Sequence, residues 1–129
     1  MSYHFSKTLE LSFEQAVART REALAAEGFG VISEIDVAQT LKSKIGVEFR
    51  PYLILGACNP RMAYEALQLE DKVGTMLPCN VVVQAVGAGR TEVAAIDPEA
   101  SMQAIANPEL KAKAREVGEK LKAALARLD

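Results

Sequence analysis

Two cysteine–asparagine pairs are the residues of this sequence best suited to chemistry. Cys58-Asn59 ends an apolar segment and precedes Pro60, and Cys79-Asn80 precedes a second apolar segment. A thiol at the start of a helix lies near the positive end of the helix dipole, which favours the thiolate. Cys58 has such a position, whereas Cys79 has no obvious one. Two thiols with neighbouring amide side chains could bind an anion, a soft metal or an electrophilic ligand.

The same cysteines also fit a purely structural role, because cysteine is among the most buried residue types and packs as a small apolar side chain. A zinc site within one chain would need His4, the only histidine, or carboxylates such as Glu34 and Asp36. We therefore expect no resident metal, and the sequence identifies no cofactor. Glu34 and Asp36 could instead act as an acid–base pair, although Asp36 is equally explained as a helix cap.

The composition excludes several classes of function. Half of the 129 residues are hydrophobic and a quarter are charged, which is typical of a globular chain rather than a disordered one. A net charge of −2, aromatic residues at 5% and no tryptophan argue against a nucleic-acid partner. We find neither an apolar run of about 20 residues nor a signal-peptide core, so we expect no membrane partner and a cytoplasmic location.

Hydrophobic periodicity and turn residues predict the elements that must position these groups. Strands are expected at residues 3–9, 29–35, 49–57, 81–86 and 91–96, and helices at 13–27, 37–45, 62–69, directly after an Asp97-Pro98 cap, and from 107 onward. Ser12 and Gln15 form a capping-box pattern, and Pro51 favours an edge or a strand start. This order predicts one α+β domain over residues 1–129, with a mostly antiparallel sheet and helices packed on one face.

The other face of such a sheet would be apolar. Ile32, Val82 and Val86 are its candidate residues. An open apolar face usually pairs with another subunit or holds a ligand, and a symmetric homodimer is the commonest outcome for a small chain. We therefore expect a homodimer, with a small-molecule ligand as a further partner.

Five segments resemble a known family: residues 27–31, 34–36, 55–60, 77–81 and 95–98. Together they are similar to the uncharacterised prokaryotic family catalogued as domain of unknown function 302, and the resemblance covers most of the chain. It implies a fold similar to that of the TATA-binding protein, in which a curved antiparallel sheet carries two main helices. It also implies homodimers. The family brings no established reaction, so no catalytic residue can be carried over.

Three functions follow from these patterns. The first is a homodimeric small-molecule or thiol-linked binding module, with Cys58, Asn59, Cys79 and Asn80 at a shared site. The second is a non-enzymatic protein-interaction module, favoured by the poor catalytic inventory and the open sheet face. The third is an enzyme that uses a thiol or the carboxylates of Glu34 and Asp36, and the sequence leaves open whether there is any catalysis.

Overall fold

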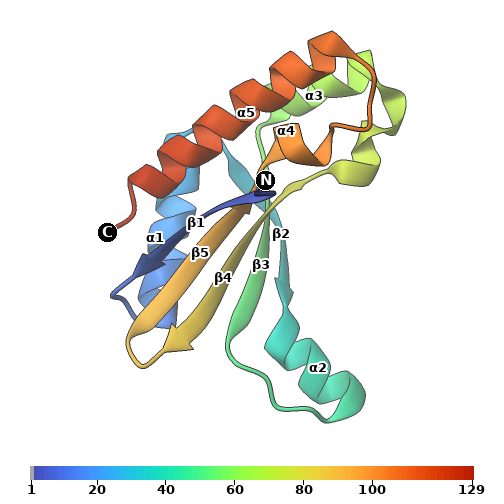
Figure 1. Cartoon of the computed structure of the whole chain (residues 1–129). Coiled ribbons are helices and arrows are strands. Elements are labelled where there is room, and N and C mark those ends of the chain that lie inside the picture. The colour runs from blue at the N-terminus through green and yellow to red at the C-terminus, as the bar shows by residue number, and fades with distance from the viewer. Residues whose placement is uncertain (1) are drawn as a thin grey trace.

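One antiparallel sheet forms the centre of the molecule. A computed structural model describes residues 2–129. Its strands are β1 (His4–Leu9), β2 (Gly30–Asp36), β3 (Tyr52–Cys58), β4 (Cys79–Gly87) and β5 (Arg90–Ile96). They lie in the order β1-β5-β4-β3-β2, so β1 and β2 are the edges (Figure 1). The predicted α+β class with an antiparallel sheet is therefore confirmed.

Two long helices cover one face of this sheet. They are α1 (Phe13–Ala26) and α5 (Pro108–Ala126), and their buried leucines join the side chains of the central strands in one core. Because successive residues of a strand point to opposite faces, alternate positions supply that core. The core-facing residues of β3, β4 and β5 are Leu53, Leu55, Ala57, Cys79, Val81, Val83, Val93 and Ala95.

The remaining helices lie at the two ends of the sheet. At one end are α3 (Pro60–Leu69), the 3-10 helix η1 (Asp71–Met76) and α4 (Pro98–Ser101), which form a second hydrophobic cluster with the first half of α5. At the other end α2 (Val37–Ile45) projects from the sheet and buries none of its residues (Figure 1). None of the helices described is long and apolar enough to cross a membrane.

Local capping explains where the helices begin. The Ser12 hydroxyl accepts a hydrogen bond from the Gln15 amide, and the Gln15 side chain accepts one from the Ser12 amide, so the predicted capping box is confirmed. Asp36 caps α2 through the Gln39 amide at 2.9 Å. The third predicted strand begins only at Tyr52, because the proline before it lacks an amide hydrogen for the ladder.

The outer face of the sheet carries one apolar row between two more polar rows. The strand register pairs Ile35 with Ile54, Ile54 with Val82, and Val82 with Ala94. These four residues therefore form one row across four strands on the same face. Ile32, which we expected on this face, lies at an irregularity of β2 where the register shifts between its two neighbours. A β-bulge re-aims the side chain at such a point, and nothing in the sequence marks it.

Candidate ligand-binding cavity

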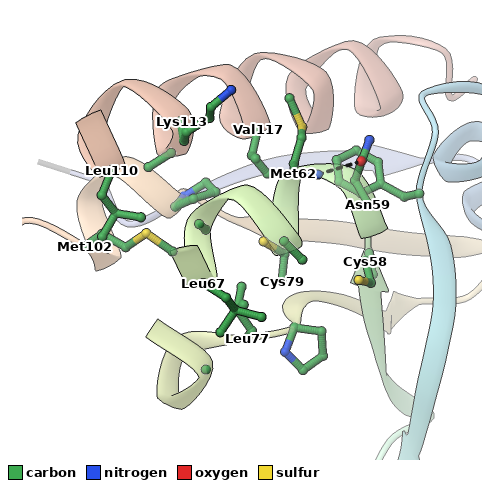
Figure 2. A pocket seen from close by; sticks show the side chains of 18 of the residues that line it. Cys58, Asn59, Met62, Leu67, Leu77, Cys79, Met102, Leu110, Lys113 and Val117 are labelled. Carbon is green, nitrogen blue, oxygen red and sulfur yellow. Dashed lines mark hydrogen bonds between the residues drawn. The ribbon is translucent and has the colours of Figure 1, made fainter. Parts of the chain in front are cut away.

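A cavity of about 340 Å³ lies where one end of the sheet meets the smaller helices. This volume falls at the lower end of the range of small-molecule pockets, about 300–1,000 Å³. Its wall is almost entirely apolar (Figure 2). The lining side chains come from five regions: Phe29 and Ile32; Ala57, Cys58 and Cys79; Asn59, Met62, Ala63, Ala66 and Leu67; Gly74, Leu77 and Pro78; and Pro98, Met102, Leu110, Lys113, Ala114 and Val117.

Strand pairing brings the two cysteine segments together. Ala57 and Cys79 are register partners at adjoining ends of β3 and β4, and Cys58 follows Ala57 directly. Cys58 and Cys79 therefore line the same cavity although 20 residues separate them in the sequence. Asn59 lies beside Cys58, and its side-chain oxygen accepts a hydrogen bond from the Met62 amide at 3.2 Å, which caps α3 (Figure 2).

The two thiols differ in their surroundings. Both are free, but Cys58 is half-buried and Cys79 is only 7% exposed. Burial, with a smaller contribution from the nearby Cys58, raises the pKa of the Cys79 thiol to about 11. A buried thiol resists ionisation because the apolar interior disfavours the charged form. At neutral pH Cys79 is therefore a protonated, unreactive part of the wall, and Cys58 is the thiol that a reagent can reach.

A single charged residue lines the cavity, within the part of the chain that the structure describes. This is Lys113 of α5, and its ammonium lies 2.9 Å from the Glu65 carboxylate of α3 and 3.6 Å from that of Glu116. The hydrogen bond from Lys113 to Glu65 is the main cause of a raised pKa of the lysine. The lysine therefore stays charged, and the carboxylates of Glu65 and Glu116 balance its charge at the rim of the cavity.

The rim also exposes apolar side chains. Ile32 is 66% exposed and Leu67 is 42% exposed, and both line the cavity. Ile32 belongs to β2 and Leu67 to α3, so the entrance of the cavity is apolar, as its interior is. A molecule that entered there would cover surface that is otherwise in water.

The other residues singled out from the sequence lie elsewhere. Asn80 is exposed and is not among the lining residues. Glu34 forms an ion pair with Arg21, and Asp36 caps α2, so these two carboxylates have structural partners and do not reach the cavity. Across residues 2–129, His, Cys, Asp and Glu side chains form no group of three that could hold a metal ion.

Sequence reasoning missed the helical half of the wall. Leu110, Ala114 and Val117 follow the core-facing stripe of α5, and their periodicity predicts burial without distinguishing a filled core from a cavity. The sequence does contain one signal for a cavity, which is the small size of the residues that face α5. Ala63 and Ala66 of α3 lie across from α5, and short side chains on facing helices leave space between them.

The fold and the site together define a class: an α+β domain whose antiparallel sheet ends at an apolar cavity. The chain belongs to the family described as Domain of unknown function DUF302, whose model matches residues 5–128. It is similar to a crystallised protein from Bacillus stearothermophilus, described as an uncharacterized conserved protein DUF302, with 31% identity, a TM-score of 0.92 and 100% of each chain covered. None of the curated proteins matches the chain. The family resemblance predicted from the sequence is therefore confirmed.

Proposed function

We propose that this chain is a binding module for a small, mainly apolar molecule, with Cys58, Asn59 and Cys79 in the wall of its site. The observation that carries this proposal is the cavity of about 340 Å³. Protein interiors are normally close-packed, so a cavity of this size lowers stability unless a ligand fills it. At about 30 Å³ for each water-sized group, it has room for roughly ten such groups.

The thiol-linked part of the proposal rests on Cys58. It is the more exposed of the two cysteines and lies just before the cap of α3. The environment of Cys79 favours the protonated form, which leaves Cys58 as the side chain able to attack an electrophilic ligand. A cytoplasmic location, where thiols stay reduced, is part of the same proposal.

Decanol is a suitable probe, since it is apolar and has about the size of the cavity. Met62 and Met102 line the cavity, whereas Met76 packs in the adjoining cluster without lining it. We expect decanol to shift the isotopically labelled methyl signals of Met62 and Met102 saturably, and that of Met76 less. Alkylation of Cys58 by iodoacetamide should slow in the same titration.

Two substitutions that fill the cavity make this experiment decisive. Ala63→Leu and Ala114→Leu add bulk to opposite walls, whereas Ala112→Leu adds it to an exposed position of the same α5. We expect both filling variants to weaken decanol binding at least tenfold and Ala112→Leu to leave it unchanged. Ala63 is only half-buried, so its variant should fold even if the Ala114 variant does not. Saturable binding that ignores both substitutions would reject the cavity as the site.

We further propose that the module works as a homodimer, paired through the outer sheet face. Ile35 of the apolar row is 50% exposed, and beyond the row Ile45 at the end of α2 is 66% exposed. Exposed apolar residues on a strand edge and on an unsupported helix favour a partner surface. The two long helices α1 and α5 cover the other face and leave this one open, and a fold similar to that of the TATA-binding protein is part of the same proposal.

Sedimentation equilibrium at micromolar concentration tests the dimer. Ile35→Glu places a charge in the apolar row, and Ala25→Glu, at an exposed position of α1 on the opposite side of the sheet, is its matched control. We expect the mass of two chains for the parent and the control and of one chain for Ile35→Glu. A parent that sediments as a single chain would exclude the homodimer and leave a partner protein as the alternative for this face.

A further inference from the structure

The charge at the rim of the cavity limits what the cavity can bind. Lys113 contributes its aliphatic stem to the wall, while its ammonium meets Glu65 from α3 and Glu116 from its own helix. Figure 2 shows the Lys113 nitrogen turned away from the sulfur atoms of Cys58 and Cys79. Lysine commonly buries its methylene groups in this manner and keeps its charge in water. The interior of the cavity therefore faces hydrocarbon, not an ammonium group.

Among the lining residues that the structure describes, an anionic ligand would find no cation without a carboxylate partner. The Lys113 ammonium already has two carboxylates within 4 Å, at 2.9 and 3.6 Å, so the three groups carry one net negative charge. A ligand carboxylate would have to displace one of them or enter an apolar interior unpaired, and burying an unpaired charge is strongly unfavourable. An uncharged molecule meets neither cost.

The polar atoms deeper in the wall carry no positive charge that could pair with a ligand carboxylate in place of Lys113. The Asn59 oxygen is hydrogen-bonded to the Met62 amide. Cys79 carries a protonated thiol, which is a weak donor. The side-chain nitrogen of Asn59 is an uncharged donor, and the remaining lining is methyl, methylene, aromatic and thioether surface, apart from the Cys58 thiol. Such a wall recognises shape and apolar area and offers an anionic headgroup no opposite charge.

We propose that the Glu65–Lys113 ion pair makes this cavity selective for uncharged, mainly apolar molecules, with Glu65 as the residue that determines the specificity. The inference rests on the proposed function, because it presumes that the cavity binds a small molecule. Glu65 acts through Lys113: it holds the ammonium at the rim and cancels its charge. Removing the Glu65 carboxylate leaves Lys113 with only its longer contact to Glu116 and removes the net negative charge of the three groups, which lowers the cost of placing a fatty carboxylate beside the ammonium.

Decanol and decanoate provide a matched pair of probes, since they share one chain and differ in charge. For the parent protein at neutral pH we expect decanol to bind at least tenfold more tightly than decanoate, measured by the Met62 and Met102 methyl shifts. Glu65→Gln should tighten decanoate binding about tenfold and leave decanol within twofold. Glu116→Gln is the matched control, and its longer contact predicts a smaller gain. Adding Lys113→Met to Glu65→Gln should abolish the gain.

The outcomes separate the two proposals. If decanoate binds the parent as tightly as decanol and both are lost in Ala63→Leu, the cavity is a binding site but the selectivity is wrong. If Glu65→Gln leaves the affinity for decanoate unchanged, Glu65 does not determine specificity. If neither probe binds the parent, the proposed function itself fails, and this inference fails with it. Glu65 and Glu116 are both on the surface, so their variants should fold as the parent does.

Discussion

The two halves of helix α5 lie in opposite kinds of surroundings. In the second half Leu121, Ala124 and Leu125 pack into the main core over the sheet. In the first half Leu110 and Ala114 belong to the second cluster and line the cavity. The apolar spacing is the same in both halves, so the helix does not create the difference. The facing residues do: branched strand residues and α1 face one half, and alanines of α3 face the other.

This contrast separates stability from binding capacity within one helix. The filled half is close-packed, so its side chains make dispersion contacts on all sides. The hollow half gives up contacts at the cavity wall and gains room for a ligand. Small elements surround it, because η1 and α4 span only residues 71–76 and 98–101. We expect this end of the molecule to open locally before the sheet core does.

Truncating one leucine in each half should give the largest difference. Leu121 and Leu110 are both fully buried. We expect Leu121→Ala to lower the free energy of unfolding by about 3–5 kcal/mol, because it creates a new cavity in a packed core. Leu110→Ala should cost only about 2–3 kcal/mol, because part of its side chain already faces empty space. Urea denaturation of both variants measures the difference, and equal losses would show that the two halves are packed alike.

The pH dependence of the free energy of unfolding tests whether the boundary between the filled and hollow regions is shielded from solvent. Cys79 belongs to the main core and also lines the cavity. Its pKa is about 11 in the folded protein and near 9.0 when exposed, so the folded state holds the proton more tightly. The contribution of Cys79 to the free energy of unfolding is therefore fully present below about pH 9 and is lost as the pH rises toward 11. We expect this thiol alone to remove about 1 kcal/mol between about pH 8 and pH 10.

The comparison with Cys79→Ala isolates this effect from other groups that titrate in alkali. The parent should lose about 1 kcal/mol more than the variant over that interval, measured by urea denaturation at each pH. The Cys58→Ala variant should still lose most of this stability at high pH, since burial is the larger of the two causes of the raised Cys79 pKa. Parallel pH profiles for the parent and Cys79→Ala would mean that Cys79 is solvated through the cavity.

The regular elements could be predicted from the sequence because their signals are local. Ser12 with Gln15 marks a helix start, and alternation over residues 3–9 marks a strand; both signals depend on neighbours within a few residues. A shared site for Cys58 and Cys79 was one of the two hypotheses that the sequence left open, since each lies beside the end of an apolar strand. The structure adds the register that pairs those two strand ends.

The cavity and its charge could not be predicted, because both depend on contacts between distant residues. Lys113 and Glu65 lie 48 positions apart, and no local pattern indicates that they meet. Ile32 lines the cavity at the point where the register of β2 shifts, and strand alternation alone does not predict that shift. Asn80 has the same Cys-Asn context as Asn59, yet Asn59 caps a helix and lines the cavity while Asn80 is exposed on the sheet.

Gly118 lies between the two halves of α5 and gives the smallest expected effect. A β-carbon there would lie 3.6 Å from Pro98 and 3.9 Å from the Phe5 ring, which are ordinary contact distances. The close crossing that would require glycine is therefore not present. We expect Gly118→Ala to raise the free energy of unfolding by about 0.5–1 kcal/mol through helix propensity, without changing decanol affinity.

The control for this substitution is Gly56→Ala on β3. A β-carbon there would lie 2.7 Å from Pro78 and also collide with the Ser33 hydroxyl, so this variant should be less stable by about 1–3 kcal/mol. Thermal denaturation should move the two alanine variants in opposite directions. If Gly118→Ala also destabilises, α5 is tightly packed at its midpoint. The boundary between the filled and hollow halves then lies nearer to Ala114 than to Gly118.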